Sequence, residues 1–178
     1  MLDIVKARKG TLPMALTGRL QFIYENLLPQ KAVWDFCCDH GYLGIEALRS
    51  QNFAEVYFVD RVPTIMQALE KLVQEKFSEV SKDARFLLVD GAEVSEPVTG
   101  TMVVAGVGAV SIFLILQSLW RKNLLQAERL ILAPQRDEKK FLAMLSEVSD
   151  DFLNVYSLRT EHVLQEKTRA RFVYILTR

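Results

Sequence analysis

The 178-residue chain has few of the residues that build disulfide frameworks or metal centres: two cysteines, which are adjacent, and two histidines. Cys37 and Cys38 do not form a disulfide framework, and the chain has no Cys-x-x-Cys pair. We therefore expect no zinc site and no other metal. A nucleophilic pair of a cysteine with His40 is the alternative for this segment, although adjacent cysteines at a strand end are more often core residues.

Net charge and long apolar runs are also lacking. The 22 basic residues balance 22 acidic ones, which argues against a protein that coats nucleic acid but leaves a local basic patch open. The most apolar stretch, residues 102–119, contains two glycines, two serines and a glutamine, which favours a buried strand, a turn and a helix over a membrane span. The first ten residues do not resemble a signal peptide. We expect a cytoplasmic protein without membrane contact, as a monomer or a weak dimer.

Three nucleotide-binding or hydrolase motifs are missing as well. The chain has neither a phosphate-binding loop ending in Gly-Lys-Ser/Thr nor a Gly-x-Ser-x-Gly elbow. Where a dinucleotide enzyme has three spaced glycines, this chain has Cys37, Asp39 and Gly41. These differences count against an NAD-dependent enzyme.

Apolar runs alternate with helical patterns from about residue 32 to residue 147. The expected strands are 31–38, 56–60, 86–90, 101–105 and 129–133, and the expected helices are 15–28, 42–49, 65–77, 110–120 and 138–148. Strands that each lead into a helix predict an α/β fold with a doubly wound, mostly parallel sheet.

The last thirty residues break this alternation. Two strands are expected at 152–163 and 170–176, with a polar hairpin turn at 161–168. An antiparallel hairpin of this kind would complete a seven-stranded sheet. Dinucleotide dehydrogenases keep the strand–helix alternation, whereas methyltransferases that use S-adenosylmethionine usually finish with a reversed strand. Fold alone does not fix the chemistry.

Ligands of a doubly wound sheet bind beyond the carboxyl ends of its strands. Four turns are expected there, and the first is DFCCDHGYLG at residues 35–44. Asp35 lies within an apolar strand, and Gly41 lets the backbone approach a ligand closely. An ordinary turn in which an aspartate caps the next helix fits this segment equally well.

The other three turns contain acids or small residues. Asp60 follows Asp39 by 21 positions and can accept hydrogen bonds from both ribose hydroxyls of an adenosine, each contributing roughly 1.5–3 kcal/mol. Its alternative role is to cap the next helix. Asp90-Gly91 can meet an adenine amino group or form a simple turn. The sequence AGVG at 105–108 leaves space for a methyl donor to meet a base, or lets a helix pack closely on the sheet.

Six segments resemble, in the same order, those of the bacterial TrmK family, tRNA (adenine-22-N1)-methyltransferases that use S-adenosylmethionine. They are LTGRL at 16–20, DFCCDHGYL at 35–43, FVD at 58–60, VDGAEV at 89–94, AGVGA at 105–109 and LILAPQ at 130–135. The resemblance implies a Rossmann-like methyltransferase fold, S-adenosylmethionine as cofactor and tRNA as partner, with N1 of an adenine as acceptor.

The resemblance also implies roles for particular residues. Donor binding is expected from Asp35, Cys37, Gly41, Asp60, Arg61, Asp90, Gly91, Ala105, Gly106 and Gly108, catalytic positioning from Asp39, His40 and Tyr42, and tRNA phosphate contacts from Lys6, Arg8, Lys9 and Arg19. We expect a basic N-terminal helical segment at 1–31 and an S-adenosylmethionine-binding methyltransferase domain at 32–178, together forming one compact domain.

The chain departs from the family pattern at several positions. Cys37 replaces a glycine and adds a side chain where the donor should pass, Ala109 replaces another glycine, and Gly44 replaces a proline. Because of these departures and the neutral net charge, two alternatives stay open. One is a methyltransferase of a protein or small molecule, and the other is a non-catalytic module that kept the fold.

Overall fold

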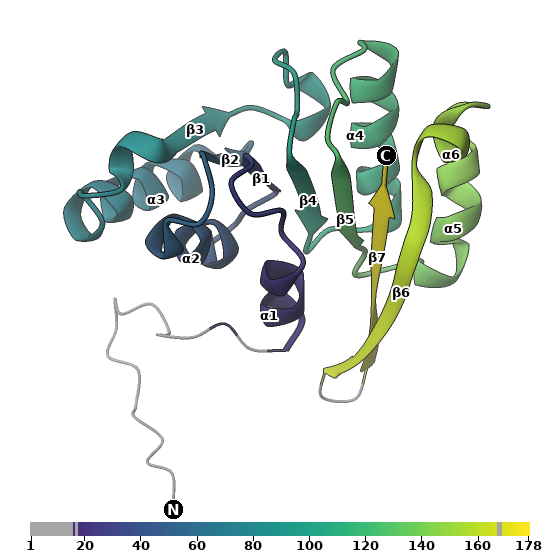
Figure 1. Ribbon diagram of the computed structural model, residues 1–178, viewed down its shortest axis with the longest axis horizontal. Helices are drawn as coiled ribbons and strands as arrows, with labels where there is room; N and C mark the ends of the chain where they lie inside the picture. Colours follow the sequence, from purple (N-terminus) through teal and green to yellow (C-terminus); the bar gives the residue numbers. More distant parts are fainter. Residues whose placement is uncertain (1–15, 17, 167–168) are drawn as a thin grey trace, which may run out of the picture.

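Five short apolar segments form the parallel part of a seven-stranded sheet (Figure 1). They are β1 (Val33–Phe36), β2 (Val56–Asp60), β3 (Ala84–Leu88), β4 (Thr101–Ala105) and β5 (Arg129–Ala133), each parallel to its neighbours among these five. The three central strands β1, β4 and β5 are buried almost throughout, because helices cover both of their faces. The strand order β3-β2-β1-β4-β5-β7-β6 confirms the predicted doubly wound, mostly parallel sheet.

Helices cover the two faces of this sheet. The computed structural model describes residues 16, 18–166 and 169–178. Its helices are α1 (Gly18–Glu25), α2 (Tyr42–Ser50), α3 (Pro63–Lys76), α4 (Ala109–Arg121), α5 (Glu138–Ser146) and α6 (Phe152–Val155), with short 3₁₀ turns η1 (Ser81–Asp83) and η2 (Gly91–Glu93). None of the helices in this described part is long and apolar enough to cross a membrane.

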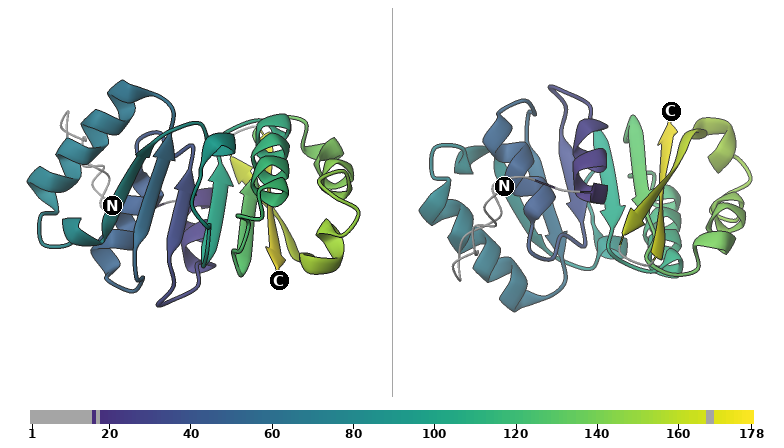
Figure 2. Two further views of the ribbon diagram at one scale, coloured as in Figure 1. Left: turned by 90° about the horizontal axis from the view of Figure 1, so that it is seen from above. Right: turned by 90° about the horizontal axis from the view of Figure 1, so that it is seen from below.

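Two hydrophobic cores correspond to the two faces. Ile23 of α1 and Val73 of α3 belong to one cluster of buried residues, and Ile112 of α4 and Phe141 of α5 belong to the other. The two views of Figure 2 show these opposite faces, with α4 in front of the strands in one view and α1 in front in the other. The carboxyl ends of the parallel strands therefore lie between two helical layers.

The C-terminal hairpin consists of β6 (Ser157–Glu166) and β7 (Arg169–Thr177). β7 is antiparallel to both β5 and β6, which confirms the predicted reversed strand. The prediction was wrong for Phe152–Val155, which form α6. Phe152 and Tyr156 pack edge-on against Trp120 of α4, and one helical turn brings both rings to the same side.

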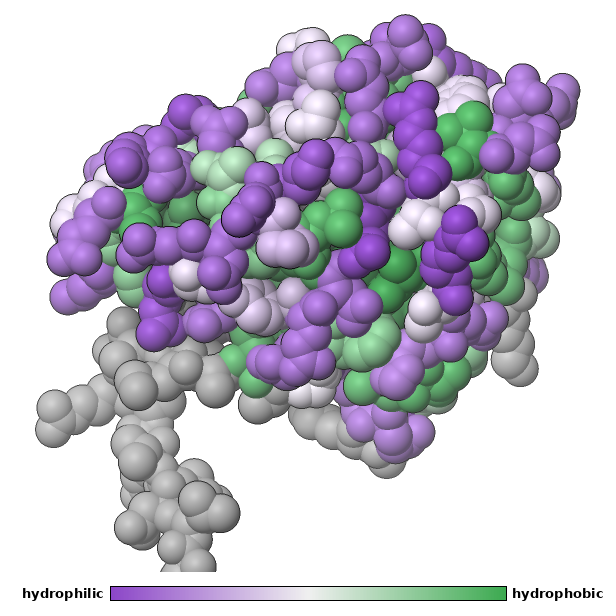
Figure 3. All heavy atoms as spheres, in the orientation of Figure 1, coloured by the Kyte–Doolittle hydropathy of each residue, from purple (hydrophilic) through white to green (hydrophobic). Residues whose placement is uncertain are grey.

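The predicted turn at 161–168 is wrong for residues 161–166, because β6 continues to Glu166. Its residues alternate between exposed and half-buried positions, as in a strand with one face on the protein. The polar residues that suggested a turn lie on an edge strand, whose outer face is solvated. The face of the molecule seen in Figure 3 is mostly hydrophilic, with smaller hydrophobic areas between.

Helix α1 packs against this hairpin. The ring of Phe22 stacks on His162 of β6 with centroids 4.0 Å apart. α1 is shorter than the predicted helix at 15–28, and Lys6, Arg8 and Lys9 lie outside the described residues. The contact brings Arg19 of α1 to the edge of the sheet at which the parallel strands end.

Candidate functional site

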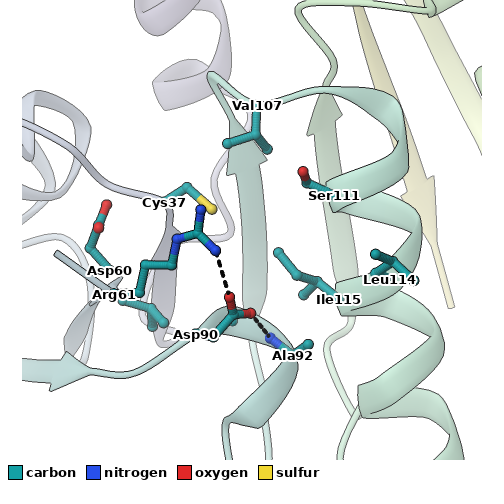
Figure 4. A pocket seen from close by; sticks show the side chains of 11 residues that line it. Cys37, Asp60, Arg61, Asp90, Ala92, Val107, Ser111, Leu114 and Ile115 are labelled. Carbon is teal, nitrogen blue, oxygen red and sulfur yellow. Dashed lines mark hydrogen bonds and ion pairs between the residues drawn. The ribbon is translucent and has the colours of Figure 1, made fainter.

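Two cavities lie beyond the carboxyl ends of the parallel strands, and Cys37 lines both. The first cavity, of about 290 Å³, lies between the end of β2, the turn η2 and helix α4 (Figure 4). The second cavity, of about 180 Å³, lies between α1, the turn from β1 to α2 and the ends of β4 and β5. This is the edge at which a doubly wound sheet binds ligands.

Two carboxylates line the first cavity. Asp60 accepts hydrogen bonds from the backbone N–H of Asp39 at 3.3 Å and of Val62 at 3.0 Å. Val62 is itself the N-cap of α3 and no side chain caps the helix, so the capping alternative for Asp60 is not observed. Asp90, in contrast, accepts from the N–H of Ala92 at 3.0 Å and caps η2. Each carboxylate oxygen has a second lone pair for a ligand.

The other walls of the first cavity are an arginine and an apolar surface. The guanidinium of Arg61 lies between Cys37 and Asp90, and its Nη1 is 3.3 Å from Asp90 Oδ2 (Figure 4). Val107 and Ile115 form part of the apolar side. A mainly apolar cavity with a few placed polar groups suits a flat aromatic ligand.

Cys37 lies at the boundary between the two cavities. Its φ of 57° is in the left-handed region that favours glycine. Burial first, and then the nearby carboxylates of Asp60, Asp35 and Asp90, raise the pKa of the Cys37 thiol to about 12. The sulfur is therefore protonated at neutral pH, which argues against the nucleophilic alternative.

The second cavity contains two buried groups of opposite charge. Asp35 is 5% exposed, and its Oδ2 accepts a hydrogen bond from the N–H of Gly44 at 3.2 Å. Burial raises the pKa of Asp35 to about 7, against the opposite effect of the Gly44 hydrogen bond, and Asp60 raises it further. The carboxyl of Asp35 therefore lacks a cationic partner strong enough to keep its pKa low.

Arg19 is the basic group of the second cavity. Its side chain is 13% exposed, and its Nε lies 3.8 Å from Glu166 Oε1. The same carboxylate also faces Nε of Arg171 at 3.6 Å. Nε and Nη1 of Arg19 are buried and make no hydrogen bond to any described residue. Buried donors of this kind are costly unless they are paired, so this end of the cavity suits an anion.

The mouth of the second cavity contains the predicted catalytic residues. Asp39 and His40 are exposed there, and Nε2 of His40 is 3.9 Å from Oδ1 of Asp39. The ring of Tyr42 lies 5.5 Å from that of His40, at an angle of 34°. Gly106, with φ 86°, is exposed in the same wall. Flat rings beside a residue without a side chain leave room for a base.

The structure gathers most of the predicted site residues into these two cavities. Cys37, Asp60, Arg61, Asp90 and Gly91 line the first, and Arg19, Asp35, Cys37, Asp39, His40, Tyr42, Ala105 and Gly106 line the second. Gly41 and Gly108 line neither cavity. A Cβ on Gly41 would lie 2.7 Å from Leu69, so this glycine permits packing against α3.

The sequence did not lead us to predict several other residues that line the two cavities. Ser111, Leu114 and Ile115 of α4 line the first cavity, and Gln135 lines the second. Gln135 directly follows Pro134 at the end of β5, so the rule that selected the other strand ends would have found it. Within the described residues, no group of three or more His, Cys, Asp and Glu side chains could hold a metal ion.

Comparisons with known proteins agree with this architecture. A family model described as "Methyltransferase domain" matches residues 16–174. The B. subtilis m1A22 tRNA methyltransferase TrmK is 22% identical with a TM-score of 0.76, over 93% of this chain and 67% of that one. M. capricolum TrmK, solved with S-adenosyl-homocysteine, is 19% identical with a TM-score of 0.72, over 91% and 68%.

A further structure with the same fold has a different acceptor. The magnesium protoporphyrin IX methyltransferase ChlM of Synechocystis, solved with bound S-adenosylmethionine, is 19% identical with a TM-score of 0.67, over 88% of this chain and 74% of that one. No curated protein sequence matches the chain. At these identities the solved structures show a shared fold.

Proposed function

The chain belongs to the methyltransferase domain family, and we propose that it is an S-adenosylmethionine-dependent RNA methyltransferase that modifies N1 of an adenine in tRNA. The observation that carries the proposal is the second cavity, which is lined by the loop after β1, by a buried carboxyl and by a guanidinium whose buried Nε and Nη1 make no hydrogen bond within the described part of the chain. An amino acid, which carries one charge of each sign, matches that pair.

The residues present fit the parts of S-adenosylmethionine. Asp60 has lone pairs for the ribose hydroxyls and Asp90 for the adenine amino group, beside the apolar wall of the first cavity. In the second cavity, Asp35 would hold the ammonium group and Arg19 the carboxylate. Cys37 lies at the boundary, so the sulfur of the donor would pass beside its side chain.

The reaction places few demands on the protein. When bound, S-adenosylmethionine supplies a methyl group on a positively charged sulfur, which is a good leaving group. The lone pair of adenine N1 forms the new N–C bond as the C–S bond breaks, and the electron pair of that bond stays on sulfur. No base has to remove a proton first. Orientation of two reactants in this way can lower a barrier by about 7–11 kcal/mol.

The residues at the mouth of the second cavity provide that orientation. The base would stack on the rings of His40 and Tyr42, and stacking on an aromatic ring contributes roughly 1–3 kcal/mol. The carboxylate of Asp39 would stabilise the positive charge that develops on the methylated base. This division gives the buried end of the cavity to the donor and its exposed end to the acceptor.

The tRNA contacts are supported unequally. Lys6, Arg8 and Lys9 remain predicted phosphate contacts, with the salt sensitivity that such contacts bring. Arg19 was predicted to join them, but the burial of its side chain in the wall of the second cavity favours an anion inside the cavity over a phosphate at the surface.

A small-molecule acceptor is the second candidate, because the fold is shared with ChlM, whose acceptor is a porphyrin. Nucleoside mass spectrometry separates the two candidates. Bulk tRNA incubated with the full chain and S-adenosylmethionine is expected to gain N1-methyladenine. Asp39→Asn should slow the transfer while the donor affinity stays unchanged, and the exposed Asp150→Asn should alter neither. A protein that binds the donor but leaves every tRNA nucleoside unmodified would refute the tRNA proposal.

A further inference from the structure

Gln135 is fixed by its backbone at the end of β5. Its N–H donates to the carbonyl of Val107, in the turn after β4, at 2.8 Å. Its own carbonyl accepts a hydrogen bond from Nη1 of Arg171, in β7, at 3.0 Å. Both main-chain groups are thus used, and they tie the residue to elements on two sides.

The side chain of Gln135 is half-buried and lines the second cavity together with Tyr42, His40 and Gly106. Its amide nitrogen lies 3.7 Å from the position that a Cβ on Gly106 would occupy. The amide makes no hydrogen bond to any described residue. It therefore presents two N–H donors and a carbonyl acceptor at the end of the cavity assigned above to the acceptor.

We propose that Gln135 selects adenine as the acceptor by pairing with the edge of the base that carries N6 and N7, an inference that rests on the proposed function. The amide N–H donates to N7, and the amide carbonyl accepts from the N6 amino group, the bidentate pairing that glutamine makes with adenine. Because N1 lies on the adjoining edge, it stays available for methyl transfer.

The same pairing rejects guanine. Guanine presents N7 and O6, which are both acceptors, so the amide carbonyl would face a second carbonyl oxygen. Good bidentate pairs discriminate between bases by about tenfold to a hundredfold. Gln135 would thus determine which purine is modified, whereas His40 and Tyr42 hold any flat base.

Replacement of N7 by a C–H group in the adenosines of the substrate tests this pairing. tRNA transcripts made with 7-deazaadenosine in place of adenosine lack the N7 acceptor but keep N1 and N6. For the wild-type protein, kcat/KM is expected to fall about tenfold on this substrate. Gln135→Leu should lose about tenfold on the normal transcript and nothing further on the deaza transcript, because its contact to N7 is already gone.

Two further variants control the comparison. Gln135→Glu keeps an acceptor for N6 but has no donor for N7, so it should also be insensitive to the deaza substitution. Gln126→Leu changes an exposed residue that precedes β5, whereas Gln135 follows it. This variant should show the same loss on the deaza transcript as wild type. Calorimetric binding of S-adenosylmethionine is expected to be the same for Gln135→Leu and wild type, which shows that the variant is folded.

The outcomes separate this inference from the proposed function. If wild type and Gln135→Leu respond equally to the loss of N7, or if wild type does not respond, Gln135 does not read the base, although the enzyme still methylates RNA. If wild type methylates neither transcript, the proposed function itself fails, and the inference fails with it.

Discussion

The two cavities differ in how their polar groups are satisfied. In the first, the oxygens of Asp60 accept hydrogen bonds from backbone N–H groups, and Asp90 is bonded to Ala92 and Arg61. In the second, Asp35 is buried with a raised pKa, and two nitrogens of Arg19 have no hydrogen-bond partner among the described residues. The polar groups of the first cavity are hydrogen-bonded within the protein. Those of the second are buried at a cost in free energy that a bound ligand would offset.

The sharpest test of this difference is the effect of pH on stability. Asp35 binds a proton more tightly in the folded protein than in the unfolded chain, because its pKa is about 7 when folded against 3.8 when unfolded. The contribution of Asp35 to the free energy of unfolding should therefore be most favourable below about pH 4 and should fall by roughly 2–4 kcal/mol as pH rises through about 7.

Asp35→Asn should abolish that fall, because an amide does not titrate but can still accept from the N–H of Gly44. Urea denaturation near pH 4 and near pH 8 measures it: the variant is expected to match wild type at the lower pH and to be roughly 2–4 kcal/mol more stable at the higher one. Asp150→Asn, which is exposed, should follow wild type. If the free energy of unfolding changed equally with pH for Asp35→Asn and for wild type, ionisation of Asp35 would not destabilise the folded protein.

Loss of the Arg19 guanidinium, whose buried Nε and Nη1 make no hydrogen bond to any described residue, should have the next largest effect, on ligand binding. Arg19→Met keeps an apolar stem but removes the charged donors, and hydrogen bonds to a charged group contribute about 1.5–3 kcal/mol. The affinity for S-adenosylmethionine should fall by about tenfold to a hundredfold, while the free energy of unfolding should not fall, because the variant no longer buries donors without hydrogen bonds. Arg49→Met, in the last turn of α2 and outside the lining of both cavities, is the matched control for calorimetry. An affinity within twofold of wild type would remove Arg19 from the donor site.

Replacement of Cys37, which lies at the boundary between the two cavities, should change the affinity for the donor less than Arg19→Met does, and should raise it. Its left-handed backbone costs a non-glycine residue about 1 kcal/mol or more, part of which glycine recovers. Cys37→Gly should stabilise the protein slightly and tighten donor binding several-fold by opening the passage. Cys37→Ser keeps the size and the strain, and should bind like wild type. Weaker binding by Cys37→Gly would mean that the thiol contacts the donor favourably.

The ion pair of the first cavity should matter least for stability. The side chain of Arg61 is 76% exposed, and exposed pairs contribute about 0–1 kcal/mol. Arg61→Ala is therefore expected to change the free energy of unfolding by less than about 1 kcal/mol, and added salt should reduce the difference between variant and wild type. A larger loss that salt leaves unchanged would show that the first cavity, too, depends on a buried charge.

Local patterns predicted the fold well where they were regular. The bounds of the strands at 56–60, 101–105 and 129–133 match β2, β4 and β5, because buried parallel strands are short apolar runs between polar turns. The pattern failed at Phe152–Val155, where aromatic residues that suit a strand pack as one helical turn against α4. Contacts with α4, which the local sequence does not reveal, determine the helical conformation of that segment.

The residues of the site likewise include some that local patterns predict and some that they do not. Asp60 and Asp90 could be predicted because strand ends place them at one edge of the sheet. The burial of Arg19 could not, because it depends on α1 packing against β6, where Glu166 lies far along the chain. The position of Gln135 at a strand end could have been predicted, but its backbone hydrogen bond to Val107 in the turn after β4 could not, because it joins two segments far apart in the sequence.

Calorimetric titration of S-adenosylmethionine into the full chain tests the central claim most directly, namely that the carboxyl edge of this sheet holds the donor across both cavities. We expect saturable one-to-one binding, and an affinity lower by about tenfold to a hundredfold for Asp60→Ala, since the ribose would lose bonds to a charged group. No heat of binding at millimolar donor, or an unchanged affinity for Asp60→Ala, would contradict it.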